Sequence, residues 1–125
     1  MSGFATLIMV NIDCAEPPVL ATFYSEVLGW DVTHTQAEYA MISDGTTSIG
    51  FGQIEGYTAP TWPDPVDAAP VPKQFHLDFY VDDLADAEER ALKLGATRPD
   101  FQPAPDRYLV LLDPAGHPFC ACLRS

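Results

Sequence analysis

An imidazole, a carboxylate and a phenol alternate with apolar side chains in residues 75–83, whose sequence is FHLDFYVDD. Successive side chains of a β-strand point to opposite faces, so His76, Asp78 and Tyr80 would share one face of a half-buried strand. His76 could contact a ligand or take part in acid–base chemistry, and Asp78 could act as a general base. The alternatives are a histidine hydrogen-bonded to a neighbour and a solvated aspartate at a rim. This spacing makes His76 and Asp78 the candidate catalytic residues.

The elements that would position this strand form one series twice. In the first half the sequence predicts a strand over residues 5–13 and a helix that starts within 14–18, with prolines in its first turn, continues over 19–28 and ends at Gly29. Strands are predicted over 30–35, 39–43 and 47–54. In the second half it predicts the strand over 75–83, a helix over 84–94 between Asp83 and Gly95, and strands over 98–102, 107–112 and 117–123. We therefore expect two tandem βαβββ modules in an α+β fold.

The expected core consists of apolar residues on the helix-facing sides of the strands and the sheet-facing sides of the helices. It comprises Ile8, Val10, Ile12, Leu20, Phe23, Val27, Leu28, Leu77, Phe79, Val81, Ala87, Ala91 and Leu94. Between the halves, residues 55–73 are rich in proline, which predicts an extended linker without a strand ladder.

Composition excludes several classes of function. A chain of 125 residues suits one compact domain, and its net charge of −12 argues against nucleic acid or an anionic membrane as a partner. No stretch predicts a signal peptide or a membrane span. The three cysteines lack a CxxC spacing, and Cys120 and Cys122 are placed poorly for a mutual disulfide. Reduced thiols in a cytoplasmic protein are the simplest expectation.

Counting from the helix starts aligns the two modules. His76 lies seven residues before Asp83, and Met9 lies seven residues before Glu16. Met9 is therefore the expected equivalent of His76, and Asn11 that of Asp78.

Five segments in order, FYSEVLGW, PTWPDP, HLDFYVDDL, LGA and DPAGHPF, resemble the vicinal oxygen chelate superfamily of glyoxalases, bleomycin-resistance proteins and extradiol dioxygenases. The chain is most similar to the bacterial glyoxalase-like and bleomycin-resistance-like subgroup. The resemblance implies a single domain over residues 1–125, with module one at 5–54, the linker at 55–73 and module two at 74–123. In such a fold the mixed sheets curl into a cup that holds the ligand, and the helices lie outside.

Metal-dependent relatives take ligands from the first and last strand of each module. Carried over, these positions are His76 and Cys120 in module two, and Met9 with a residue within 50–53 in module one, where Gln53 alone offers an oxygen. A complete site for Ni or Zn is therefore not expected. His76 with Cys120, and with Gln53 as a further candidate, could still hold zinc. The alternative is that Cys120 is a small buried apolar residue.

The resemblance also indicates which residues would contact a ligand. Trp62 would stack on a ligand if the linker crosses the mouth of the cup, or anchor the linker on the outer surface. The expected ligand-binding set is Met9, Asn11, Phe51, Gln53, Trp62, Tyr80, Tyr108 and Cys120.

Two functions remain open at this point. One is a binding module for a small, partly apolar, uncharged or cationic molecule; the other is a lyase or isomerase that uses His76 with a divalent metal or as an acid/base. A third, a domain that only binds a protein partner, is also compatible. A homodimer is expected, because open sheets leave edge strands to cover.

Overall fold

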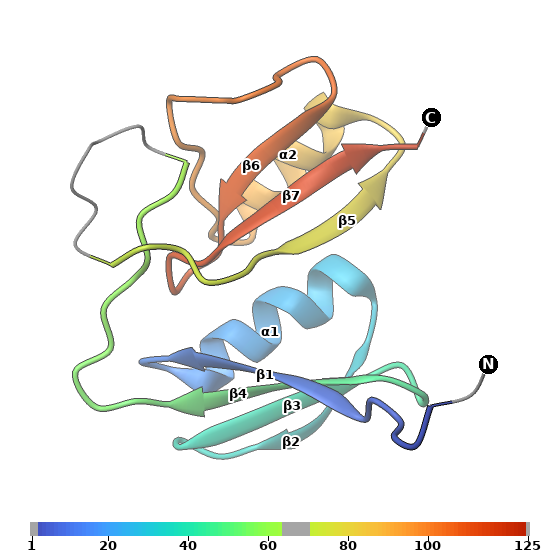
Figure 1. The fold of residues 1–125 in the computed structure, drawn as a ribbon, viewed down its shortest axis with the longest axis vertical. Helices are drawn as coiled ribbons and strands as arrows, with labels where there is room; N and C mark the ends of the chain where they lie inside the picture. Colours follow the sequence, from blue (N-terminus) through green and yellow to red (C-terminus); the bar gives the residue numbers. More distant parts are fainter. Residues whose placement is uncertain (1–2, 64–70, 125) are drawn as a thin grey trace. The chain divides into compact units, whose positions relative to one another are not determined.

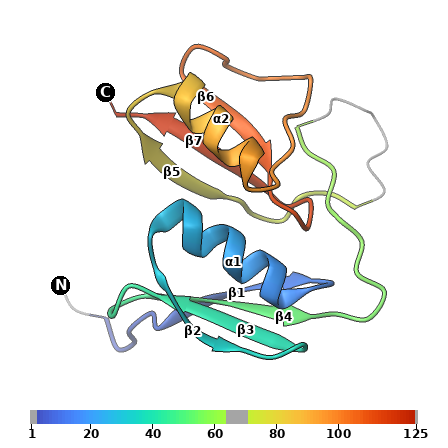
Figure 2. The same cartoon turned by 180° about the vertical axis from the view of Figure 1, so that it is seen from behind.

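The computed structural model describes residues 3–63 and 71–124, and it divides into two compact units, Met1–Tyr57 and Thr58–Ser125. In each unit one helix packs on one mixed sheet (Figure 1). Figure 2 shows from behind that each helix covers one face of its own sheet. In the described residues no helix is long and apolar enough to cross a membrane. The cytoplasmic location stays a prediction.

The first unit follows the predicted series. Its elements are β1 (Met9–Cys14), α1 (Pro17–Leu28), β2 (Asp31–Thr35), β3 (Tyr39–Ser43) and β4 (Ser48–Gln53). The sheet order is β1-β4-β3-β2, with β1 parallel to β4 and the other pairs antiparallel. The helix starts where predicted, with Pro17 and Pro18 in its first turn, where a missing N–H costs nothing.

Helix α1 ends where Gly29 adopts a left-handed conformation with φ of 72°. The side of α1 that packs on the sheet buries Leu20, Phe23 and Tyr24. The first two were predicted as core residues. Of the residues predicted as core in this unit, Ile12, Leu20 and Phe23 are buried, whereas Val10, Val27 and Leu28 are only half-buried. The prediction for Ile8 is wrong: it is 72% exposed, because β1 begins only at Met9.

The second unit contains β5 (Leu77–Val81), α2 (Leu84–Lys93), β6 (Tyr108–Leu112) and β7 (Pro118–Leu123). The sheet order is β5-β7-β6, with β5 parallel to β7 and β6 antiparallel to β7. Asp83 caps α2 by accepting a hydrogen bond from the N–H of Asp86, as predicted. Leu94 was predicted as core, but it follows the helix and is 38% exposed.

The strand predicted over residues 98–102 is wrong. Residues 98–102 form no strand. The isolated bridge between Thr97 and Leu112 lies one residue before the predicted strand. The Gln102 side chain takes the place of a strand neighbour: its amide accepts from the N–H of Val110 at 2.8 Å and donates to the C=O of Val110 at 3.0 Å. Pro99 and Pro103 lack the N–H groups that a ladder needs, which explains why one side chain makes these bonds instead.

The described part of the linker forms no strand ladder. Thr61 makes one isolated parallel bridge with Pro72, and its N–H donates to the C=O of Val71 at 2.7 Å. This single bridge agrees with the prediction, whose part over residues 64–70 lies outside the described residues.

Candidate functional site

The face of β5 and β7 opposite α2 carries the chemically active side chains. Asp78 pairs with Cys120 and Tyr80 with Cys122 in the parallel register, so these side chains share one face. The apolar residues between them point to the other side, where the rings of Phe79 and Phe119 lie 5.7 Å apart. The alternation seen in the sequence therefore produces one apolar face and one polar face.

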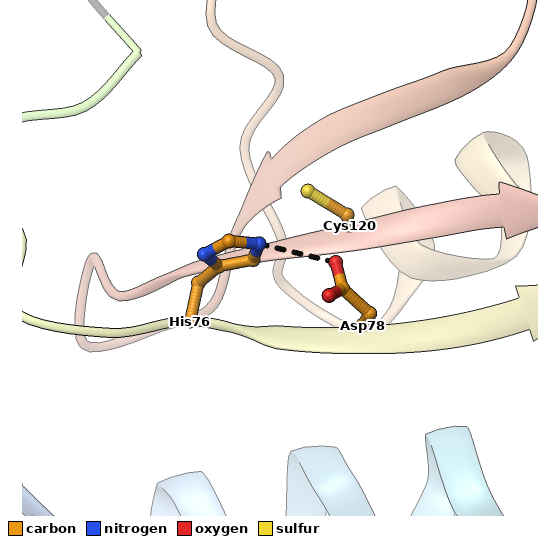
Figure 3. Close-up of side chains that lie close together, drawn as sticks. All are labelled: His76, Asp78 and Cys120. Atoms are coloured by element: carbon orange, nitrogen blue, oxygen red, sulfur yellow. Dashed lines mark hydrogen bonds and ion pairs between the residues drawn. The ribbon is translucent and has the colours of Figure 1, made fainter.

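His76, directly before β5, forms the centre of a hydrogen-bonded chain. Its Nε2 lies 3.1 Å from Asp78 Oδ1, and its Nδ1 lies 3.3 Å from Lys73 Nζ (Figure 3). A lysine ammonium can only donate, so Nδ1 accepts and the ring proton resides on Nε2, from which it is donated to Asp78. These contacts thus favour the tautomer in which Nε2 carries the ring proton.

Trp62 lies on this imidazole rather than away from the sheet. The two rings stack with centroids 5.2 Å apart and an angle of 20°, and Lys73 Nζ lies 4.1 Å from the indole centroid. The lysine therefore contacts both rings, through a hydrogen bond to His76 and a cation–π contact to Trp62. Of the two placements predicted for Trp62, the structure has it beside the predicted polar face.

An open pocket of about 560 Å³ lies over this face of the second unit. Six of the predicted site residues line it, His76, Asp78, Trp62, Tyr80, Tyr108 and Cys120, together with Phe79 and Cys122. The rings of Trp62, Tyr80 and Tyr108 thus form much of the wall, and one carboxylate and one imidazole supply polar contacts. This composition is typical of a small-molecule site.

Both thiols in the pocket are held in the protonated form. Cys120 is only 2% exposed, and burial, followed by the negative charge of Asp78, raises the pKa of its thiol to about 12. Burial and Asp78 also raise the pKa of Cys122, whose Sγ lies 3.9 Å from Asp78 Oδ1. The cysteines are free thiols in the described chain, and these two are not activated nucleophiles.

The first unit carries a different set at the equivalent positions. Asn11 pairs with Gly50 in β1–β4 as Asp78 pairs with Cys120 in β5–β7. Gly50 is therefore the equivalent of Cys120, a position that the sequence left open within residues 50–53. The Tyr39 hydroxyl donates to Asn11 Oδ1 at 3.2 Å, and Met9 lies beside the same glycine.

Gln53 and Phe51 lie elsewhere. Gln53 is at the exposed end of β4, where its side-chain amide donates to the C=O of Ala15 at 3.2 Å. Phe51 is fully buried and stacks on Tyr24 of α1, with ring centroids 5.8 Å apart. Phe51 therefore faces the helix, whereas Gly50 and Gly52 lie on the side of Asn11, and its contact with a ligand stays a prediction.

Two site residues were missed by the sequence analysis. Cys122 shares a strand face with Cys120, and the same period of two that located Asp78 could have located it. Tyr39 reaches Asn11 from β3 across β4, so only the sheet order reveals the contact.

The paired α+β units, each with a parallel first and last strand, define the glyoxalase/bleomycin resistance/dioxygenase fold. A family model described as Glyoxalase-like domain matches residues 9–122, so the chain belongs to this family. The chain is similar to a glyoxalase/bleomycin resistance protein/dioxygenase family enzyme from Burkholderia phytofirmans PsJN, with 21% identity, a TM-score of 0.70, and 95% of this chain and 98% of the other covered.

Two further solved structures share the fold. Fosfomycin resistance protein FosX from Mesorhizobium loti has 16% identity and a TM-score of 0.66, with 98% and 94% of the two chains covered. A bleomycin-binding protein from Streptomyces verticillus, complexed with copper(II)-bleomycin, has 14% identity and a TM-score of 0.60, with both chains covered completely. No curated protein matches the sequence.

The residues present do not fit the metal site that spans two modules in metal-dependent relatives. At the positions of module one, Met9 offers a thioether and Gly50 offers no side chain. A hard divalent ion needs oxygen or nitrogen ligands there. No reaction step is therefore assigned to a family-type metal centre.

Proposed function

We propose that this protein binds a small, partly apolar molecule in the pocket on the polar face of β5 and β7, without the complete metal site of its metal-dependent relatives. The observation that carries the proposal is the stack of Trp62 on His76, with ring centroids 5.2 Å apart, beside the carboxylate of Asp78. The stack offers a flat aromatic surface, and Asp78 offers an acceptor for a ligand N–H or a cationic group.

Charge narrows the class of ligand. The chain has a net charge of −12, which favours an uncharged or cationic ligand over a multiply charged anion. The bleomycin-binding protein of similar fold is a precedent, at the level of fold alone, for binding a small molecule. We also propose that the whole chain forms a single domain.

Binding can be tested by a thermal-shift screen of flat aromatic amines and neutral heteroaromatic compounds, followed by tryptophan fluorescence. The chain has two tryptophans, Trp30 and Trp62, so a Trp30→Phe variant makes Trp62 the sole reporter. A compound present at 100 times its Kd should stabilise the protein by about 2.7 kcal/mol and change the Trp62 emission.

Two variants decide whether binding occurs at this pocket. Asp78→Asn and Trp62→Ala should weaken binding about tenfold or more, since each removes a main polar or stacking contact. Asp100→Asn is the matched control, because Asp100 is exposed and lies outside the pocket lining. Wild-type affinity in both pocket variants, or no hit in the screen, would refute the proposal.

The second candidate is a lyase or isomerase that uses His76 as an acid or base. It is favoured by one observation, the 3.1 Å contact in which Asp78 orients the imidazole. Incorporation of solvent deuterium next to the carbonyl of small carbonyl compounds, followed by NMR, would test it. Exchange that disappears in His76→Ala supports this candidate, and equal exchange in both proteins excludes it.

A homodimer completes the proposal. Strands β1 and β2 are the edges of the first sheet, and Phe4, Leu7 and Ile8 before β1 are 103%, 74% and 72% exposed. Open edges and apolar side chains next to them favour association of two copies. Light scattering should give twice the mass of 13.7 kDa, and an Ile8→Asp variant should shift toward the monomer.

A further inference from the structure

Three chemically different metal ligands lie together within the second unit. The ligand atoms of His76, Asp78 and Cys120 all lie within 4.8 Å of one another. Figure 3 shows the imidazole and the carboxylate rising from the β5 segment and the thiol from β7, on the same side of the two strands. Zinc bonds of about 2.0–2.3 Å place tetrahedral ligand atoms about 3.3–3.8 Å apart. Small side-chain rotations would therefore bring all three to one ion.

The charges and ligand types of this set suit zinc. A carboxylate and a thiolate neutralise the charge of a divalent ion, and the imidazole contributes a neutral nitrogen. Sulfur and nitrogen ligands favour zinc over hard ions such as Mg²⁺. The site is also sheltered on the sulfur side, because Cys120 is only 2% exposed.

We infer that His76, Asp78 and Cys120 form a three-ligand zinc site contained within one module, in place of the family-type site that spans two modules. Met9 and Gly50 take no part, and the fourth position faces the pocket and stays open for water or a ligand group. Coordination replaces the S–H bond of Cys120 by a bond to zinc, and the thiol proton leaves to solvent. His76 binds through Nε2, so the ring proton that Nε2 carries in the metal-free protein transfers to Nδ1.

Lys73 distinguishes this site from a preformed metal centre. Its Nζ lies 3.3 Å from His76 Nδ1, which accepts a hydrogen bond in the metal-free protein. Once Nδ1 carries the proton, two donors would face each other, so the ammonium must move away when zinc binds. Zinc and the Lys73–His76 contact therefore exclude each other.

Cobalt(II) titration of the full chain tests the ligand set directly. Wild-type protein should develop a sulfur-to-cobalt charge-transfer band in the near ultraviolet, and zinc should abolish it by displacement. Cys120→Ser should lose the band. His76→Ala and Asp78→Asn should each weaken zinc binding by about 100-fold or more, since loss of a residue that only supports a ligand already costs about 10- to 100-fold. Far-UV circular dichroism checks that each variant is folded.

Cys122→Ser is the matched control, because Cys122 lies on the same strand face but outside the three-ligand cluster. It should keep the band. A wild-type protein without a thiolate band, or a band that survives in Cys120→Ser and is lost in Cys122→Ser, would overturn the inference.

The inference deepens the proposed function, since it concerns the same pocket, and the two can fail separately. Organic ligands are screened in the presence of a metal chelator, whereas cobalt is titrated without them. Ligand binding without a cobalt band leaves the proposed function and removes the zinc site. A cobalt band without binding of an organic ligand leaves the zinc site and removes the proposed function.

Discussion

Replacement of Gly50 by alanine tests how the first unit fills the position that corresponds to Cys120. A Cβ added at Gly50 would overlap Asn11 Oδ1 and Tyr39 Oη and come within 2.9 Å of Met9 Cε. Real Cβ atoms essentially never lie within 3.0 Å of such neighbours. The added methyl group must therefore push at least one of these side chains away and break the 3.2 Å hydrogen bond between Tyr39 and Asn11.

The expected loss of stability is modest, because all three neighbouring atoms are the ends of flexible side chains that can rotate away. The main cost is the lost hydrogen bond between Tyr39 and Asn11, which is exposed and contributes about 0.5–1.5 kcal/mol. We expect Gly50→Ala to lower the free energy of unfolding in urea by about 0.5–1.5 kcal/mol, and the thermal midpoint by about 2–8 °C.

Gly52→Ala is the matched control, because Gly52 lies on the same face of β4 and a Cβ there would meet nothing within 4 Å. In an Asn11→Ala/Tyr39→Phe background, both overlapping oxygens are gone and Gly50→Ala should cost less than about 0.5 kcal/mol. The reasoning is refuted if Gly50→Ala is tolerated as well as Gly52→Ala, or if it costs as much in the double-variant background.

Three further predictions concern other parts of the chain. Asp113→Ala should lower the free energy of unfolding by about 2–4 kcal/mol, and Asp113→Asn by less, since the buried Oδ1 of Asp113 accepts from the N–H groups of Ala115 and His117 at 2.8 and 3.0 Å; equal losses would contradict this. Lys73→Met should tighten zinc binding about fivefold to tenfold by removing a competing positive charge, as measured by chelator competition; unchanged affinity would show that Lys73 does not compete. Hydrogen bonds from Thr47 and Thr46 lower the pKa of Asp44 below its ordinary value of 3.8, so its contribution is present above that pH and is lost as the pH falls through the lowered pKa. The stability difference between wild type and Asp44→Asn, measured in urea, should therefore shrink on acidification, and a difference that grows would exclude this role.

Local sequence patterns were sufficient for most of the fold. Alternation in residues 75–83 separated the polar face of β5 from its apolar face, and the pattern around Leu20 and Phe23 located α1. These features depend on chain neighbours a few residues apart, so they can be read directly from the sequence. The strand expected over residues 98–102 failed because the prolines, and the side chain of Gln102 reaching Val110, outweighed the apolar and aromatic residues nearby.

The sequence by itself determined the family, the two-module series and the candidate residues His76, Asp78 and Cys120. Only the tertiary structure decided which of them meet. The register of β5 on β7 brings Asp78 beside Cys120, and that of β1 on β4 brings Gly50 to the matching place and directs Phe51 toward α1. Strand register depends on contacts between residues about 40 positions apart, which no local pattern encodes, and a shift by one residue would exchange the two faces of a strand.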